Sequence, residues 1–258
     1  MGLIIAFTFI ALVIGIISVA SSAGDWRRRQ RIIATPTTPI AQASGDCVVE
    51  IKGKVVAGEQ GVFTTPFSGR PAVFCRVTVQ EKRSRGKSTY WHTVVEEVEA
   101  RDFYVEDGSG QQARVSPRGA NAVLDKQSTA TSGTFNDAPP NLVEFLQARG
   151  HATTGWFGLN KSMQYLEEVL APGDQLYAIG PSHREAGPPA SENYRDSPSS
   201  RLVMSSTGST DPDMELLISN KPEEELVSNL GGGMKIGLLM IGASVIAGLG
   251  IVFTGLAH

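Results

Sequence analysis

The sequence contains few of the residues that build metal sites and disulfide frameworks. Its 258 residues include only two cysteines, Cys47 and Cys75, and four histidines. There is no CxxC pair and no Cys/His cluster, so the spacing typical of a zinc site is missing. In a cytoplasmic domain both cysteines would stay as thiols, and we expect each to be a small buried hydrophobe. We therefore expect no metal and no cofactor.

Recognisable catalytic motifs are also missing. The sequence has no nucleophile elbow, HExxH motif, phosphate-binding loop or paired-carboxylate spacing. His92 lies close to Glu96 and Glu97 in sequence, but a histidine beside a tryptophan on a strand is more often a surface or half-buried residue than a catalytic base. We therefore expect no catalytic residue, and an enzyme with an unrecognised site is kept as an alternative.

A strong net charge is the third absence. The 23 basic and 26 acidic residues give a formal net charge of −3. This value gives no whole-protein argument for binding nucleic acid, although it permits a local basic patch. We expect no nucleic acid partner.

Two long apolar runs are present, and the first covers residues 3–20. It carries no charge and, as a helix, would span about 27 Å, close to the hydrocarbon thickness of a bilayer. No basic residue precedes it, and four arginines follow it: Arg27, Arg28, Arg29 and Arg31. This asymmetry predicts a transmembrane helix whose C-terminal flank is cytoplasmic. A cleaved signal peptide is the alternative, but the basic n-region of such a peptide is missing.

The second apolar run covers residues 236–257, preceded by Lys235 and followed only by His258. It predicts a second membrane helix and the same topology, with both termini outside. Small residues line one helical face of each run: Ala11, Gly15, Ser18 and Ser22 in the first, and Ala243, Ala247, Gly250 and Thr254 in the second. Such faces allow a homo-oligomer through close helix packing, although Gly and Ala are common in membrane helices. The expected localisation is a bacterial inner membrane.

The residues between these runs show the alternation typical of strands. Val73, Cys75, Val77 and Val79 alternate with polar or larger neighbours in the clearest example. Residues 139–149 resemble a short helix, whereas 24–45 and 117–138 read as irregular segments. The expected fold is mainly β, a small OB-like barrel or β-roll with one or two short helices between two transmembrane helices. Its core is expected to contain Val73, Val77, Val79, Phe103 and Val105.

The predicted organisation has five parts. They are a transmembrane helix (1–23), a juxtamembrane linker (24–45), a cytoplasmic β domain (46–220), a short helix with a glycine hinge (221–233) and a second transmembrane helix (234–257).

A basic and aromatic cluster is the candidate interaction surface. It lies at a predicted hairpin tip and contains Lys82, Arg83, Arg85, Lys87, Tyr90 and Trp91. This composition is typical of a contact with anionic lipid, nucleic acid or an acidic protein, and a solvated turn is the simpler alternative. An acidic run follows it, with Glu96, Glu97, Glu99, Asp102, Glu106 and Asp107. That run is most simply a solvated face, or it pairs with the basic tip of a second copy.

Several short stretches together resemble one family. They are VVEIKGKVV (48–56), TPFSGRPAVFCRV (65–77), Trp91 with 102–115, EEVLAPGDQLYAIG (167–180) and LISNKPEEEL (217–226). Their order between two apolar runs resembles the GIDE/BAM ("beside a membrane") domain family. In eukaryotes that domain belongs to a mitochondrial and peroxisomal E3 ubiquitin ligase, and related domains occur in prokaryotic membrane proteins.

The resemblance implies a membrane-bracketed β domain related to ubiquitin ligases, but not the catalytic part. A RING needs about eight zinc ligands, whereas this sequence has two Cys and four His in scattered positions. We therefore expect a RING-less, prokaryotic-type member that binds a partner, lipid or ligand without catalysis. The alternative is a component of a stress or ubiquitin-like signalling pathway whose catalytic module is on another chain.

Overall fold

The computed structural model describes residues 10, 13, 14, 16, 17, 24, 26, 27, 29–133, 136–152, 160–186, 200–206 and 215–229. Thr37–Lys221 form one compact unit, and the described residues on either side belong to a second unit. The first unit, called the β domain below, contains all the strands. In the second unit, residues 29–34 are helical and α3 covers Glu223–Asn229.

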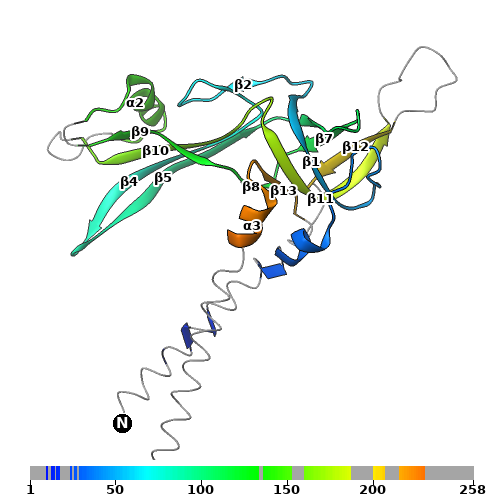
Figure 1. Cartoon of the computed structure of the whole chain (residues 1–258). Helices are drawn as coiled ribbons and strands as arrows, with labels where there is room; N and C mark the ends of the chain where they lie inside the picture. Colours follow the sequence, from blue (N-terminus) through cyan, green and yellow to red (C-terminus); the bar gives the residue numbers. More distant parts are fainter. Residues whose placement is uncertain are drawn as a thin grey trace, which may run out of the picture. The chain divides into compact units, whose positions relative to one another are not determined.

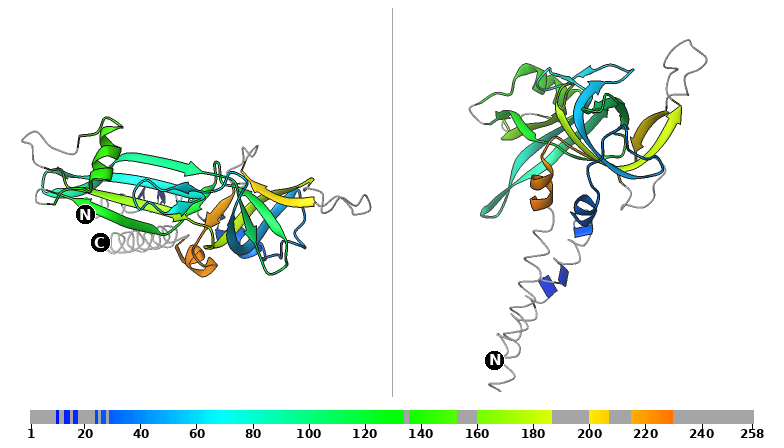
Figure 2. Two further views of the ribbon diagram at one scale, coloured as in Figure 1. Left: turned by 90° about the horizontal axis from the view of Figure 1, so that it is seen from above. Right: turned by 45° about the vertical axis from the view of Figure 1, so that its right-hand side comes forward.

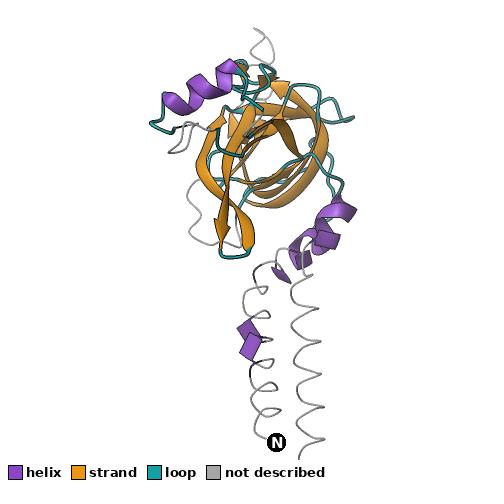
Figure 3. Cartoon of the chain, turned by 90° about the vertical axis from the view of Figure 1, so that its left-hand side faces the viewer, coloured by secondary structure: helices purple, strands orange, loops and turns teal. Residues whose placement is uncertain are grey.

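A closed barrel of five strands forms one half of the β domain (Figure 3). Its strands are β1 (Cys47–Ala57), β6 (Phe103–Glu106), β7 (Gln112–Ser116), β11 (Gln175–Ala186) and β12 (Ser200–Ser205). They follow one another as β1-β6-β7-β12-β11, and β11 pairs with β1 to close the ring. All neighbours are antiparallel except β7 and β12, which are parallel. A five-stranded Greek-key ring of this kind is OB-like, so the expectation of a small closed barrel is confirmed.

A separate four-stranded sheet extends from the barrel (Figures 1 and 2). Its order is β5-β4-β10-β9, and its strands are β4 (Phe74–Arg85), β5 (Ser88–Ala100), β9 (Lys126–Ser132) and β10 (Met163–Leu170). In the sequence, β4 and β5 lie between barrel strands β1 and β6, and β9 and β10 lie between β7 and β11. The sheet is therefore assembled from two insertions, which meet where β4 pairs with β10.

Short elements complete the β domain. They are β2 (Phe63–Thr64), β3 (Pro71–Ala72), β8 (Asn121–Val123), β13 (Leu217–Ser219) and α2 (Pro140–Gln147). β13 pairs with β11 and with β8, which adds two strands beside the barrel. The predicted helix at 139–149 is confirmed by α2, which has a proline at its first turn and buries Leu142, Phe145 and Leu146.

Two hydrophobic cores correspond to the two sheets. The barrel core contains Ile51, Val55, Phe103 and Val105 among its members. The second core lies where α2 packs on one face of the four-stranded sheet, with Cys75, Val77 and Val79 on β4 against Tyr165 on β10. Each of the five predicted core residues is at most 3% exposed, so that prediction is confirmed. Val73, Phe103 and Val105 lie in the barrel core, whereas Val77 and Val79 lie in the second core.

Polar contacts fasten the segment before β1 to the barrel. Thr37 Oγ1 donates a hydrogen bond to Oε1 of Glu50, whose side chain is buried, and Tyr177 Oη donates to Oε2 of the same carboxylate at 2.8 Å. The amide of Ile40 donates to Asp107 Oδ2 at 2.8 Å. Partial burial works against ionisation of Asp107, but hydrogen bonds from Ser109 and from the Ile40 amide lower its pKa below the usual range.

Three local predictions were wrong. Residues 117–138 were expected to be a loop but contain β8 and β9, because their polar side chains lie on an edge strand and need no apolar alternation. Residues 24–45 were expected to lack regular structure, yet 29–34 are helical. Cys47 is exposed and not a buried hydrophobe, because it begins β1 at the domain surface.

Gly53 lies within β1, close to the neighbouring strand β6. The pairing of β1 with β11 runs without a break from Cys47 to Lys54. A Cβ atom at Gly53 would collide with the backbone of Glu106 on β6. The glycine therefore permits a close approach of two backbones.

The structure describes few residues of the two predicted membrane segments. Most of residues 3–20 and all of 236–257 lie outside the described residues. Among the residues that are described, no helix has the length and apolar character needed to cross a membrane.

Candidate functional site

The hairpin of β4 and β5 carries all six residues of the predicted interaction surface. Its turn is Gly86-Lys87, where Gly86 has a φ of +63° that favours glycine. Every residue from Lys82 to His92 is exposed, and Tyr90 and Trp91 are 47% and 42% exposed. We call residues 82–91 the hairpin tip. The tip brings the six residues together at the end of a two-stranded projection.

The strand register divides the hairpin tip into two faces. Lys82 is opposite Trp91, and Arg83 is opposite Tyr90. Because directly opposite side chains lie on the same face of a sheet, the first pair shares one face and the second pair shares the other. The face of Arg83 and Tyr90 is also the face that packs against α2 further along the sheet, because alternation on β4 connects it to Val79. Each face therefore carries an aromatic ring opposite a cation, and Arg85 shares the face of Arg83.

Arg83 differs from the other cations of the tip because it is paired. Its Nε and Nη2 donate hydrogen bonds to Glu81 Oε2 at 3.0 and 2.9 Å, and Lys161 Nζ lies 3.3 Å from Glu81 Oε1. Partial burial opposes ionisation of Glu81, but the hydrogen bonds from Arg83 and Lys161 lower its pKa. Within the described part of the chain, Lys82, Arg85 and Lys87 have no ion pair. These three side chains give the tip its positive charge.

The acidic run begins where the hairpin joins the second core. Arg149, just after α2, donates from Nη2 to Glu97 Oε2 at 2.6 Å and from Nη1 to the Phe145 carbonyl at 3.0 Å. Its guanidinium carbon also lies 3.5 Å from the centre of the Phe145 ring. The hydrogen bond from Arg149 lowers the pKa of Glu97. By contrast, Glu96 and Glu99 are exposed, and the nearest cation to Glu99 is Arg101, 3.8 Å away.

A hollow of about 390 Å³ lies beside the Glu97–Arg149 pair. Cys75, Val77 and Phe145 are among the residues that line it, and Glu97, Glu99 and Arg149 are the charged ones. Burial raises the pKa of Cys75 to about 12, and the negative charges of Glu167 and Glu99 contribute further. The thiol is therefore protonated at neutral pH and is a poor nucleophile. The two acidic side chains of this hollow each lie beside an arginine, Glu97 beside Arg149 and Glu99 beside Arg101.

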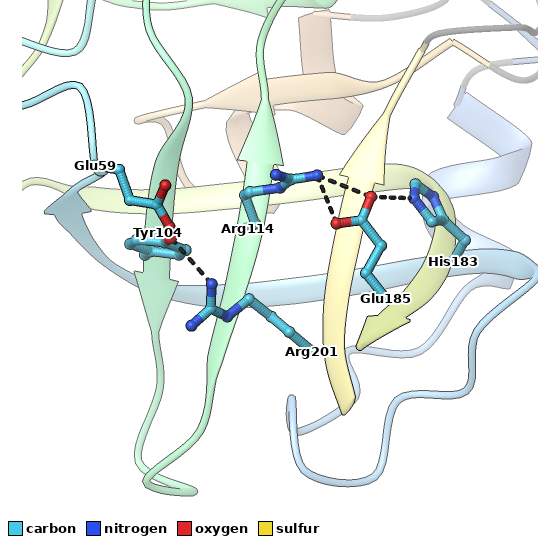
Figure 4. A network of polar contacts seen from close by, with 6 residues as sticks. All are labelled: Glu59, Tyr104, Arg114, His183, Glu185 and Arg201. Atoms are coloured by element: carbon cyan, nitrogen blue, oxygen red, sulfur yellow. Dashed lines mark hydrogen bonds and ion pairs between the residues drawn. The ribbon is translucent and has the colours of Figure 1, made fainter. Parts of the chain in front are cut away.

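A second polar network lies on the barrel surface (Figure 4). Arg201 Nη1 donates to Tyr104 Oη at 3.0 Å, and Tyr104 Oη donates to Glu59 Oε1 at 3.1 Å. Arg114 Nη2 contacts both carboxylate oxygens of Glu185 at 2.8 and 2.9 Å. His183 Nε2 lies 3.0 Å from Glu185 Oε1. Arg201 hydrogen-bonds Tyr104, and Arg114 pairs with Glu185, so the network links β6, β7, β11 and β12. Its two arginines and two glutamates leave little net charge.

The comparison with protein families gives one match. Residues 75–198 match the family model described as GIDE: E3 Ubiquitin ligase. The chain is similar to the GIDE family over these residues. The family resemblance is therefore confirmed over this range. No curated protein and no solved structure matches the chain.

The matched residues include most of the candidate surfaces. The match begins within β4 and ends between β11 and β12, so it includes the hairpin tip, most of the hollow beside α2 and part of the barrel network. Sequence reasoning found the tip because its residues are contiguous. It missed the pair Glu97–Arg149, because the two residues are 52 positions apart and no local pattern links them.

The residues predicted to set membrane topology lie outside the matched range in the sequence. Arg29 and Arg31 are half-buried in the helical stretch 29–34, and Arg27 is exposed. Arg27 and Arg31 both take part in polar interactions. Arg28 and Lys235 lie outside the described residues. Among the described residues, no group of three or more His, Cys, Asp or Glu side chains could hold a metal ion.

Proposed function

We propose that this chain is a membrane-anchored, non-catalytic GIDE-domain protein that binds an acidic partner through the hairpin tip. One observation carries the proposal: Lys82, Arg85 and Lys87 lack an ion pair among the described residues and lie beside two exposed aromatic rings. Aromatic side chains supply contact area, and unpaired cations supply attraction to an anionic surface.

The size of the expected attraction follows from simple electrostatics. Near an anionic membrane surface each basic residue contributes about 1 kcal/mol. Because the tip is exposed, the interaction is screened over about 8–10 Å at physiological ionic strength. Binding through the tip should therefore weaken strongly as salt is added.

Anchoring is the second part of the proposal and rests on the sequence. The runs at 3–20 and 236–257 are each long enough to span a bilayer as a helix, and basic residues flank the β domain side of both. In this topology the β domain is cytoplasmic and stays close to the inner surface of the membrane, where its partners are concentrated.

A charge-neutral variant tests the role of the tip. The full chain is incorporated into bilayer discs of neutral lipid, and two acidic probes are offered: a polyglutamate peptide and vesicles that contain anionic lipid. Replacing Lys82, Arg83, Arg85 and Lys87 by Ser should weaken binding of an acidic probe at least tenfold at low salt. A matched control replaces four exposed cations elsewhere, Lys54, Arg70, Arg118 and Lys126, by Ser. Equal binding by the two variants would contradict the proposal.

A role beside a ubiquitin ligase is the second candidate, favoured by the family description. In this role the chain presents a partner to a catalytic module on another chain, since its own two Cys and four His are too few for a RING with about eight zinc ligands. The purified chain should form no ubiquitin conjugates with ubiquitin, activating enzyme and conjugating enzymes alone. Conjugate formation by this chain alone would overturn the non-catalytic assignment.

A further inference from the structure

Among the strands that the structure describes, β5 is an edge strand of the four-stranded sheet. It is the first strand in the order β5-β4-β10-β9, and its thirteen residues are exposed except around Val94, Val95 and Ala100. Figure 2 shows it along the border of the sheet. Such an edge presents unpaired backbone donors and acceptors to any second strand. Tyr90, Trp91 and Val98 add exposed apolar area, and Val98 is 54% exposed.

Two hydrogen bonds identify which backbone groups face this edge. The Lys82 amide donates a hydrogen bond to the Ser162 carbonyl, on the side of β4 that faces β10. Lys82 and Trp91 are therefore a non-hydrogen-bonded pair, and the backbone N–H and C=O of Trp91 point away from β4. The Arg101 amide donates to the Val73 carbonyl, so by alternation the backbone groups of Glu96 and Val98 also face outward. The edge therefore has pairing groups on both sides of the bulge near Val79/Gln80.

Charge is distributed unevenly along the hairpin. The unpaired cations Lys82, Arg85 and Lys87 lie at the turn end, and Glu96 and Glu99 lie at the other end of β5. Edge strands usually carry charges that repel a second copy. Here the positive and negative side chains are separated by about half a strand. A second copy of the hairpin, placed antiparallel, would therefore bring its acidic end beside the basic end of the first copy, and its basic end beside the acidic end.

We propose that two copies of this chain pair through β5, antiparallel, with Trp91 of each opposite Glu96 of the other. The inference rests on the proposed function, because it names the acidic partner of the hairpin tip. The register also places Ser88 opposite Glu99 and Tyr90 opposite Glu97. This register joins outward-facing backbone groups with each other and keeps opposite side chains on the same face of the sheet, given the bulge in each strand.

This pairing gives the tip cations acidic neighbours. On β4, Arg85 lies opposite Ser88, whose small side chain leaves room for Arg85 to reach Glu99 of the second copy. On the other face Lys82 lies beside Trp91 and reaches Glu96 of the second copy. Residues two strands apart are separated by about 10 Å between Cα atoms, which extended Arg or Lys and Glu side chains can bridge. Glu99 also lines the hollow beside α2.

Cysteine pairing in the membrane tests the register directly. Cys47 is first replaced by Ser and Cys75 by Ala, because Cys75 lies opposite Glu99 in the hairpin and could pair with a cysteine introduced there. Two differently tagged full-length chains are then co-expressed, one with Ser88→Cys and the other with Glu99→Cys. Ser88 and Glu99 would form a non-hydrogen-bonded pair with Cα atoms about 4.5 Å apart, which suits a disulfide. Within one chain the two positions are about 36 Å apart along β5, so the bond can form only between copies.

The expected result is a disulfide in the mixed sample under mild oxidation. Neither substitution should form it alone, because like positions are far apart in the antiparallel register. A matched control pairs Ser88→Cys with Ser128→Cys on β9, at the opposite edge of the sheet, and reports chance collision. A second test uses the other face: Lys82→Glu or Glu96→Lys should each lower the yield of the 88–99 disulfide about fivefold, and the two together should restore it.

The outcomes separate this inference from the proposed function. A missing 88–99 disulfide, with acidic probes still bound by the hairpin tip, overturns self-pairing and leaves another protein or the lipid headgroups as the partner. Loss of both signals overturns both proposals. A disulfide of equal yield in the 88–128 control also overturns the proposed register.

Discussion

Replacing Val77 by Asp gives a quantitative test of the second core. Val77 is 3% exposed on β4, on the face that α2 covers. It lies opposite Glu167 on β10, whose carboxylate is also buried and accepts a hydrogen bond from the Phe67 amide at 3.1 Å. The introduced carboxyl would therefore lie beside an existing buried carboxylate.

The expected cost of Val77→Asp combines two effects. Losing the burial of a valine side chain costs about 1.5–3 kcal/mol. A buried polar group without a partner costs about 1–3 kcal/mol, and more when it is charged. The sum, about 2.5–6 kcal/mol and more for a charged group, approaches the whole free energy of unfolding of a typical domain, about 5–15 kcal/mol. We expect the variant to be mostly unfolded or to melt far below the native protein.

Denaturant unfolding of the full chain in detergent measures this effect. Val77→Ala should lose only about 2 kcal/mol, because it creates a cavity without introducing charge. Burial and Glu167 raise the pKa of the introduced carboxyl, so the folded state binds more protons than the unfolded state. The stability deficit of Val77→Asp should therefore shrink as the pH falls from 7 to 5. A native midpoint for Val77→Asp, or a deficit equal to that of Val77→Ala, would refute the assignment of this face to a core.

Three further predictions follow from the described residues. Maleimide should modify Cys47 in the folded chain and Cys75 only after unfolding, because Cys75 is buried with a pKa of about 12, and mass spectrometry before and after denaturation measures this. Glu50→Ala should lower the free energy of unfolding by about 2–4 kcal/mol, because Tyr177 loses its buried acceptor, whereas Glu50→Gln should cost less; equal losses in denaturant titrations would refute this. A reporter or a cysteine label at Ser109 should be on the cytoplasmic side of the membrane, and an outside location would contradict the predicted topology.

The parts of the fold that the sequence predicted are those that depend on neighbouring residues. Alternation at Val73–Val79 gave β4, and two prolines followed by apolar residues gave α2, because period and helix-start signals are local. The assembly of the four-stranded sheet from two insertions was not predicted, since the pairing of β4 with β10 joins distant segments. β9 was missed because an exposed edge strand such as KQSTATS needs no apolar residue.

The same distinction applies to the candidate site. The hairpin tip was predicted because its cations and rings lie within ten consecutive residues. The separation of its two faces depends on the register, and the pairing of Arg83 depends on Glu81 and Lys161, which a composition argument does not include. The edge position of β5 depends on the order of strands, which requires the whole fold.

Photo-crosslinking from position 91 in native membranes tests the central claim most directly. The claim is that the hairpin tip binds an acidic partner, and Trp91 can be replaced by a photoreactive phenylalanine analogue of similar shape. We predict an adduct that disappears when Lys82, Arg83, Arg85 and Lys87 are replaced by Ser and persists when Lys54, Arg70, Arg118 and Lys126 are replaced instead. The absence of any adduct, or an adduct unchanged by loss of the four tip charges, would contradict the claim.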